Sequence, residues 1–188
     1  MTQAEVLQTD LDNYDAFALL CGVKGGGQTL LPSVRNKVEM QIRKGKPFFS
    51  EFCQVIGNLR AYDVTNTRFE RPVVMNESPI TGNLEKGIIL DEQSNERIHY
   101  FNTDAVPILQ YIRNPVGFYH LSNTDNVETD VKNYALFFAQ PNLLVCSFRL
   151  CNFAKAKFTP RKVWCELISG IVRWLGGRCM PEDVESYF

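Results

Sequence analysis

The sequence predicts an α+β fold: N-terminal helices packed on a mixed, mostly antiparallel sheet of about five strands, closed by a C-terminal amphipathic helix. Three observations lead to this prediction. Residues 1–62 carry helical apolar periods, residues 63–150 carry short β-like runs, and residues 160–175 carry one pronounced helical stripe. Because 45% of the 188 residues are apolar and 22% are charged, the chain can bury a core. A single domain over 1–188 is expected, mainly helical over 1–62 and mixed thereafter.

The first part of the chain predicts three helices, over residues 2–21, 34–44 and 47–62. Thr2 and Glu5 have the spacing of a capping box, in which each side chain satisfies a free amide. Ser33 can cap the second helix, and Pro47 suits the first turn of the third. The third helix would be apolar over a wide arc, so it is expected in the centre of the core.

From residue 63 onward the sequence predicts strands that alternate with helices. A strand over 68–75 contains Pro72, which places it at the edge of a sheet or ends it. Segments 84–90 and 96–101 predict a hairpin. The remaining predicted elements are helix 104–113, strand 116–121, helix 126–139, strand 142–150 and a final helix over 160–175.

One short phrase occurs twice in the chain. His99–Val106 reads His-Tyr-Phe-Asn-Thr-Asp-Ala-Val, and His120–Val127 reads His-Leu-Ser-Asn-Thr-Asp-Asn-Val, with five of eight positions identical. Threonine or aspartate before a helical period can cap a helix, and asparagine supports a turn. The repeat therefore predicts two strand-to-helix junctions built in the same way.

The two histidines of the chain open the two copies of this phrase. If they end neighbouring strands, His99 and His120 can serve as general base and general acid, since imidazole titrates near neutral pH. His120-Leu-Ser122 resembles one H-x-[ST] motif of the two-histidine phosphoesterases, whereas His99-Tyr-Phe101 lacks the hydroxyl of the other. The resemblance implies a small hydrolase or phosphoesterase. The alternative is two structural histidines, each hydrogen-bonded at the end of a strand.

Charge is distributed unevenly along the chain. Residues 63–130 carry eleven acidic and five basic side chains, whereas residues 131–165 carry six basic and no acidic ones. Within segment 148–164 the cations alternate with aromatic residues, a composition suited to phosphates and stacked bases of single-stranded nucleic acid. The basic helix 34–44 can extend this surface. The candidate nucleic-acid-binding residues are Arg149, Lys155, Lys157, Arg161 and Lys162.

No motif for a metal or a cofactor stands out. The last four of the six cysteines are spaced C-x4-C-x13-C-x13-C, which differs from the close pairs of zinc sites. Neither G-x-S-x-G nor H-E-x-x-H occurs. We therefore expect no cofactor and no metal, and reduced thiols.

The N-terminal residues lack the basic start and apolar core of a secretory signal, and the apolar runs are too short to span a bilayer. A cytoplasmic, intracellular protein without a membrane partner is expected, including a viral protein made in its host cell. The favoured function is non-catalytic binding or assembly through protein–protein contacts, with self-association through the opposed charge segments. Nucleic-acid contact and a histidine-based hydrolase are the alternatives.

Overall fold

The computed structural model confirms the α+β class, with a mixed sheet and a C-terminal helix. It describes residues 1–21, 29–66, 70–90, 97–101, 103–113, 134–150 and 161–177. The helices are α1 (Gln3–Gln8), the short 3-10 helix η1 (Leu11–Asn13), α2 (Pro32–Arg43) and α4 (Arg161–Leu175). The strands are β1 (Phe17–Leu19), β2 (Phe48–Glu51), β3 (Val55–Ile56), β4 (Leu59–Asn66), β5 (Glu70–Val74), β6 (Arg97–Phe101), β7 (Pro107–Arg113), β8 (Tyr134–Gln140) and β9 (Leu143–Cys146).

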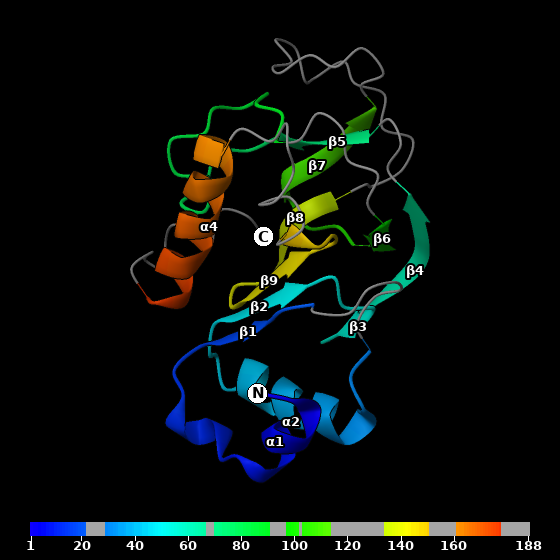
Figure 1. Cartoon of the computed structure of the whole chain (residues 1–188), viewed down its shortest axis with the longest axis vertical. Helices are drawn as coiled ribbons and strands as arrows, with labels where there is room; N and C mark the ends of the chain where they lie inside the picture. The colour runs from blue at the N-terminus through cyan, green and yellow to red at the C-terminus, as the bar shows by residue number, and fades with distance from the viewer. Residues whose placement is uncertain are drawn as a thin grey trace.

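The strands form a six-stranded sheet in the order β1-β2-β9-β8-β7-β5 and a three-stranded sheet in the order β3-β4-β6. In the larger sheet β1, β2 and β9 run parallel, and the pairs β9–β8, β8–β7 and β7–β5 are antiparallel. Figure 1 shows α4 along one face of the larger sheet, the smaller sheet on the opposite side, and α1 and α2 beside β1. The larger sheet is therefore covered on both faces.

Two apolar cores lie on the two faces of the larger sheet. One core packs Trp164, Leu167 and Ile171 of α4 against the sheet, and the other packs the stripe of α2 against it. Phe48 belongs to the α2 core and Phe49 to the α4 core, although the two residues are neighbours in β2. Successive side chains of a strand point to opposite faces, so every position of this central strand is buried.

Two of the predicted helices are confirmed. The helix expected over 34–44 is α2, which buries the apolar residues Val34, Val38 and Ile42 on one face, although it begins at Pro32 rather than after Ser33. The helix expected over 160–175 is α4. Its stripe is narrower than expected, because Ile168 and Val172 are exposed.

The helix expected over 2–21 is wrong beyond its first turns. Thr2 and Glu5 do form the predicted capping box, but α1 ends at Gln8. The Asp10 carboxylate accepts a hydrogen bond from the Asp12 amide at 3.0 Å and starts η1 instead. Side chains that bond to nearby backbone amides compete with a continuing helix.

The helix expected over 47–62 is also wrong, because this segment forms β2, β3 and the start of β4. An apolar run without a narrow stripe fits a strand that is buried on both faces as well as it fits a central helix. The same ambiguity explains two further errors. The helices expected over 104–113 and 126–139 are contradicted by strands β7 and β8, and only residues 134–139 of the second range are described.

The predicted hairpin does not form, because β6 pairs with β4 rather than with residues 84–90. The first copy of the repeated phrase leads from β6 into β7, so it is no strand-to-helix junction. The Thr103 hydroxyl accepts a hydrogen bond from the Ala105 amide at 3.3 Å and supports a turn there. The second copy and the strand expected over 116–121 lie outside the described residues.

The edge position predicted from Pro72 is confirmed, since β5 ends the larger sheet. A strap over residues 87–90 covers this edge: the Leu90 amide donates to the Pro72 carbonyl at 2.9 Å, and the Val74 amide donates to the Ile88 carbonyl at 2.9 Å. At the opposite end of the sheet order lies β1. Among the described strands none pairs with its outer edge, and Leu20, which follows it, is 63% exposed.

Candidate functional site

The seven candidate site residues are placed very differently. His99 and Arg149 are described in full, Lys162 is exposed on α4, and Arg161 is described only as the first residue of that helix. The other three, His120, Lys155 and Lys157, lie outside the described residues. The pairing of the two histidines and the position of the central lysines therefore stay predictions.

His99 lies in the core on β6. The residue is 1% exposed, and its ring stacks on Phe52 with centroids 4.0 Å apart and planes inclined by 15°. Phe101 meets the same imidazole edge-on at 6.2 Å. The His99 backbone amide donates to the Ser147 carbonyl at 2.8 Å, which ties β6 to the end of the larger sheet. Aromatic packing therefore surrounds this histidine.

Burial lowers the pKa of His99 to about 4, although the Cys53 backbone partly opposes the shift. In a medium of low polarity the charged imidazolium loses its hydration, so the neutral ring is favoured. Neither ring nitrogen has a well-placed hydrogen-bond partner among the described residues. His99 is thus neutral at physiological pH, and substrate can reach it only if the core opens.

Phe52 brings His99 and Arg149 to one place. The Arg149 guanidinium carbon lies 5.4 Å from the centroid of the Phe52 ring, at cation–π distance. Phe52 itself has φ +49°, a left-handed conformation that bulky side chains rarely adopt. Its amide donates to the Cys146 carbonyl at 2.9 Å, so the turn after β2 is fixed to β9. The contacts of the ring with His99 and Arg149 hold the strained residue in place.

Polar groups gather where the parallel strands end, beside Phe52. Glu51 is 1% exposed and accepts a hydrogen bond from the Cys21 amide at 2.7 Å. The side chains of Ser50 and Ser147 are buried here as well. Burial also raises the pKa of the Cys53 thiol. Its thiolate, the form that acts as a nucleophile, is therefore scarce near neutral pH.

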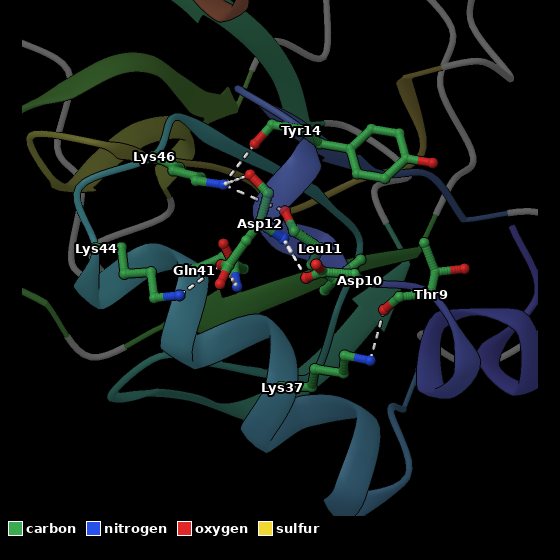
Figure 2. Close-up of polar contacts among 9 residues, drawn as sticks. All are labelled: Thr9, Asp10, Leu11, Asp12, Tyr14, Lys37, Gln41, Lys44 and Lys46. Atoms are coloured by element: carbon green, nitrogen blue, oxygen red, sulfur yellow. Dashed lines mark hydrogen bonds and ion pairs between the residues drawn. The ribbon is translucent and has the colours of Figure 1, made fainter.

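Several basic residues of and beside α2, which were expected to extend a nucleic-acid surface, are engaged within the protein. Lys37 donates to the carbonyls of Leu7 and Thr9 at 3.0 and 2.6 Å. Lys44 pairs with the Asp12 carboxylate, which also accepts a hydrogen bond from Gln41 at 2.9 Å. The pairing with Lys44 holds the pKa of Asp12 below its usual value. Figure 2 shows these side chains converging on the segment around η1.

Lys46, just beyond α2, completes this network. Its ammonium donates to the carbonyls of Leu11, Asp12 and Tyr14 at 3.2, 3.0 and 2.6 Å. Three backbone oxygens therefore surround one ammonium (Figure 2). We call residues 1–14 the N-terminal arm, since polar contacts from α2 and Lys46 fix it to the rest of the protein.

A cavity of about 320 Å³ separates part of the N-terminal arm from α2 and β1. We call it the arm pocket. Its arm side is lined by residues that include Val6 and Leu11, and its opposite side by residues that include Leu19, Val34 and Val38. All lining residues except Thr2 and Gln3 are apolar or aromatic. This volume and lining fall in the range of small ligand-binding cavities.

Sequence reasoning missed both the cluster around Phe52 and the arm pocket. Neither Phe52 nor Glu51 belongs to a motif, and a left-handed φ at a phenylalanine has no sequence signal. The arm pocket had a partial signal, since Val34 and Val38 are four residues apart and so share one face of the predicted helix 34–44. The cavity itself depends on how α1 lies relative to that stripe, which periodicity does not define.

The chain matches no protein-family model and no curated protein sequence. A solved structure with a similar fold is α-L-fucosidase isoenzyme 2 from Paenibacillus thiaminolyticus, with a TM-score of 0.60 and 10% sequence identity. The match covers 91% of this chain and 26% of the fucosidase chain, so the chain spans about a quarter of that enzyme's length. At this identity the likeness extends to the fold alone.

The described residues contain no cluster of three or more histidine, cysteine, aspartate or glutamate side chains suited to hold a metal ion. None of the helices in the same residues is long and apolar enough to cross a membrane.

Proposed function

We propose that this protein is a non-catalytic binding or assembly protein that contacts protein partners through the arm pocket. The observation that carries the proposal is an apolar cavity of about 320 Å³ beside β1, an edge strand whose outer side pairs with no other described strand. Such a cavity can take one or two large apolar side chains, while the edge of β1 can pair with an extended backbone.

The β1 strand is short, with three residues, and its outer edge pairs with no other described strand. Its sequence, Phe17-Ala-Leu19, contains no proline and no charge, whereas β5 at the other edge contains Pro72 and is covered by residues 87–90. Unprotected edges offer free backbone groups to other chains. The difference between the two edges supports partner binding on the β1 side.

The titratable groups around Phe52 support a non-catalytic role. His99 is neutral and buried, and the thiol of Cys53 has a raised pKa. General acid–base or nucleophilic chemistry needs groups that change or carry charge near the working pH and that can reach a substrate. The pKa of His99 is instead lowered and that of Cys53 raised, so neither group changes charge near neutral pH.

A peptide selection tests the proposal. The full chain is immobilised, a random peptide library displayed on phage is selected against it, and the enriched sequences are synthesised and titrated in solution. We expect peptides with an extended segment carrying large apolar side chains. Ala18→Trp, at an exposed position of β1 that lines the pocket, should weaken their binding at least about tenfold.

One control variant and two contrary outcomes make the result decisive. Val172→Trp places the same side chain on an exposed position of α4, away from the pocket, and should leave binding unchanged. Failure to enrich any peptide would count against the proposal. Enriched peptides that bind Ala18→Trp as tightly as the unsubstituted protein would also exclude the arm pocket as the binding site.

A further inference from the structure

We propose that the N-terminal arm is a clamp that closes over a partner segment in the arm pocket, so that binding of the partner and seating of the arm stabilise each other. The inference rests on the proposed function, because it concerns the regulation of the same pocket. A rigid wall of the pocket would instead leave the two processes independent.

The arm forms one wall of the pocket that the partner would fill. Val6 and Leu11 line the cavity on the arm side, and Leu19 and Val34 line it on the opposite side. A partner segment whose side chains fill this cavity of about 320 Å³ therefore contacts both walls. Such a ligand binds the seated arm more tightly than the open arm, and by linkage it stabilises the seated arm by the same factor.

Few apolar contacts hold the arm by itself. The helix α1 has six residues, and none of them is buried. Within the arm, all of which is described, Leu11 is the one buried residue, and Val6 packs against the α2 core while only partly buried. A helix this short is not stable alone, so its neighbours must hold it. An occupant of the pocket would add apolar contacts to the arm and strengthen its seating.

Polar contacts from residues that do not line the pocket seat the arm. Lys37 donates to the carbonyls of Leu7 and Thr9 at 3.0 and 2.6 Å, and Figure 2 draws the second of these bonds. Lys44 pairs with Asp12, and both side chains are about half exposed. Exposed ion pairs contribute little to stability. The arm can therefore open locally while the sheet stays folded.

The connection to the sheet lets the arm move as one unit. Phe17, the first residue of β1, donates its amide to the Pro47 carbonyl at 2.9 Å, so the strand is fixed at this point. Only Asp15 and Ala16 lie between Phe17 and Tyr14, the last residue of the arm. Rotation about these two residues would lift the arm and leave the pairing of β1 with β2 intact. The pocket would then lose its arm wall and keep the wall formed by α2 and β1.

Hydrogen exchange of the full chain at rising peptide concentration tests the clamp. The probe is the tightest peptide from the phage selection. The reporters, followed by NMR spectroscopy, are the amides of Val6, Thr9 and Tyr14, which donate within the arm at 3.0, 2.9 and 3.3 Å. A peptide that binds only the seated arm slows their exchange by the factor 1 + [L]/Kd, where [L] is the free peptide concentration. We therefore expect about tenfold slower exchange at roughly ten times Kd.

Lys37→Met provides the matched perturbation. It keeps most of the aliphatic stem and removes the ammonium that holds Leu7 and Thr9, at a position that does not line the pocket. The reporter amides should exchange severalfold faster in the free variant, and the peptide should slow them by the same factor as in the unsubstituted protein. Arg43→Met removes an exposed cation from the last turn of the same helix and should leave the rates unchanged.

Reporter amides whose exchange rates do not change with peptide would overturn the clamp. If the same peptides bind the unsubstituted protein and lose affinity in Ala18→Trp, the proposed function then stands and the arm is a rigid wall of the pocket. If no peptide is enriched, or if Ala18→Trp binds the peptides as tightly as the unsubstituted protein, the proposed function fails and the clamp fails with it.

Discussion

The imidazole of His99 stacks on the ring of Phe52, with centroids 4.0 Å apart and planes inclined by 15°. Phe52 also has the Arg149 guanidinium near its ring and a left-handed backbone at φ +49°. One strained phenylalanine thus joins β2, β6 and the residues after β9. Because the histidine in this contact is buried and neutral, the contact makes stability sensitive to acid.

We predict that the free energy of unfolding falls as pH decreases from about 6.5 to about 4. The folded-state pKa of His99 is lowered to about 4 from 6.5, so the unfolded chain binds the proton more readily. Stability from this group is therefore fully present above the unfolded pKa and is lost as pH falls toward the folded pKa. The loss can reach about 3 kcal/mol for a shift of this size. Urea unfolding at a series of pH values measures it.

His99→Leu removes the titrating group and should flatten the profile in this window, even if it changes stability at pH 7. His120→Gln alters the other histidine and should retain the slope. The Asp12 carboxylate, whose pKa is also lowered, affects stability only at lower pH. An unchanged slope in His99→Leu would show that His99 is not responsible.

A second prediction concerns the backbone of Phe52. Phe52→Ala should destabilise the protein by about 3–5 kcal/mol, because a fully buried aromatic ring is lost. Phe52→Gly loses the same ring but relieves the left-handed conformation, so it should be about 1 kcal/mol more stable than Phe52→Ala. Chemical denaturation of both variants provides the comparison. At most positions glycine is less stabilising than alanine. If Phe52→Gly were less stable than Phe52→Ala, the strain at residue 52 would be contradicted.

The elements of this fold that could be predicted from sequence are those that bury only one face. The stripe Val34, Val38 and Ile42 defines α2, and Pro72 indicates an edge strand. The central strands could not be distinguished from helices. Phe48 and Phe49 are both buried because β2 has a core on each side, and this gives an apolar run instead of an alternation.

The candidate site was less predictable for a different reason. His99 and Arg149 were each singled out, but for separate functions, and Phe52, which contacts both, belongs to no motif. The anchoring of the N-terminal arm was equally hidden. Lys46 binds backbone carbonyls, and every residue carries a carbonyl, so no residue type at the other end of these bonds reveals them.

A third prediction tests the docking of α4. A Cβ atom built on Gly170 would lie 1.8 Å from the Ile80 carbonyl oxygen and 2.6 Å from its carbon. Alanine normally favours a helix over glycine by about 1 kcal/mol. Gly170→Ala should nevertheless destabilise the protein by about 1–3 kcal/mol or more, since backbone atoms must move apart. The midpoint of thermal unfolding should fall accordingly.

Gly176→Ala is the matched control near the end of the same helix. Among the described residues, the nearest atom to its Cβ would be the Val172 carbonyl oxygen at 3.4 Å. This variant should unfold close to the temperature of the unsubstituted protein. If Gly170→Ala were as stable as Gly176→Ala, the close approach of α4 to the turn at Ile80 would be contradicted.

The last prediction concerns Lys46. Lys46→Met keeps most of the aliphatic stem but removes an ammonium that donates to three carbonyls of the N-terminal arm. Hydrogen bonds from charged groups contribute roughly 1.5–3 kcal/mol when well formed, and partial exposure reduces that value here. Amide hydrogens of the arm should therefore exchange severalfold faster, while those of β8 and β9 should keep their rates. Hydrogen exchange followed by mass spectrometry distinguishes the two regions.

Lys162→Met removes an exposed ammonium from α4 and should leave the exchange of the arm unchanged. If Lys46→Met also leaves the exchange of the arm unchanged, the Lys46 ammonium does not stabilise the arm, and other contacts hold it.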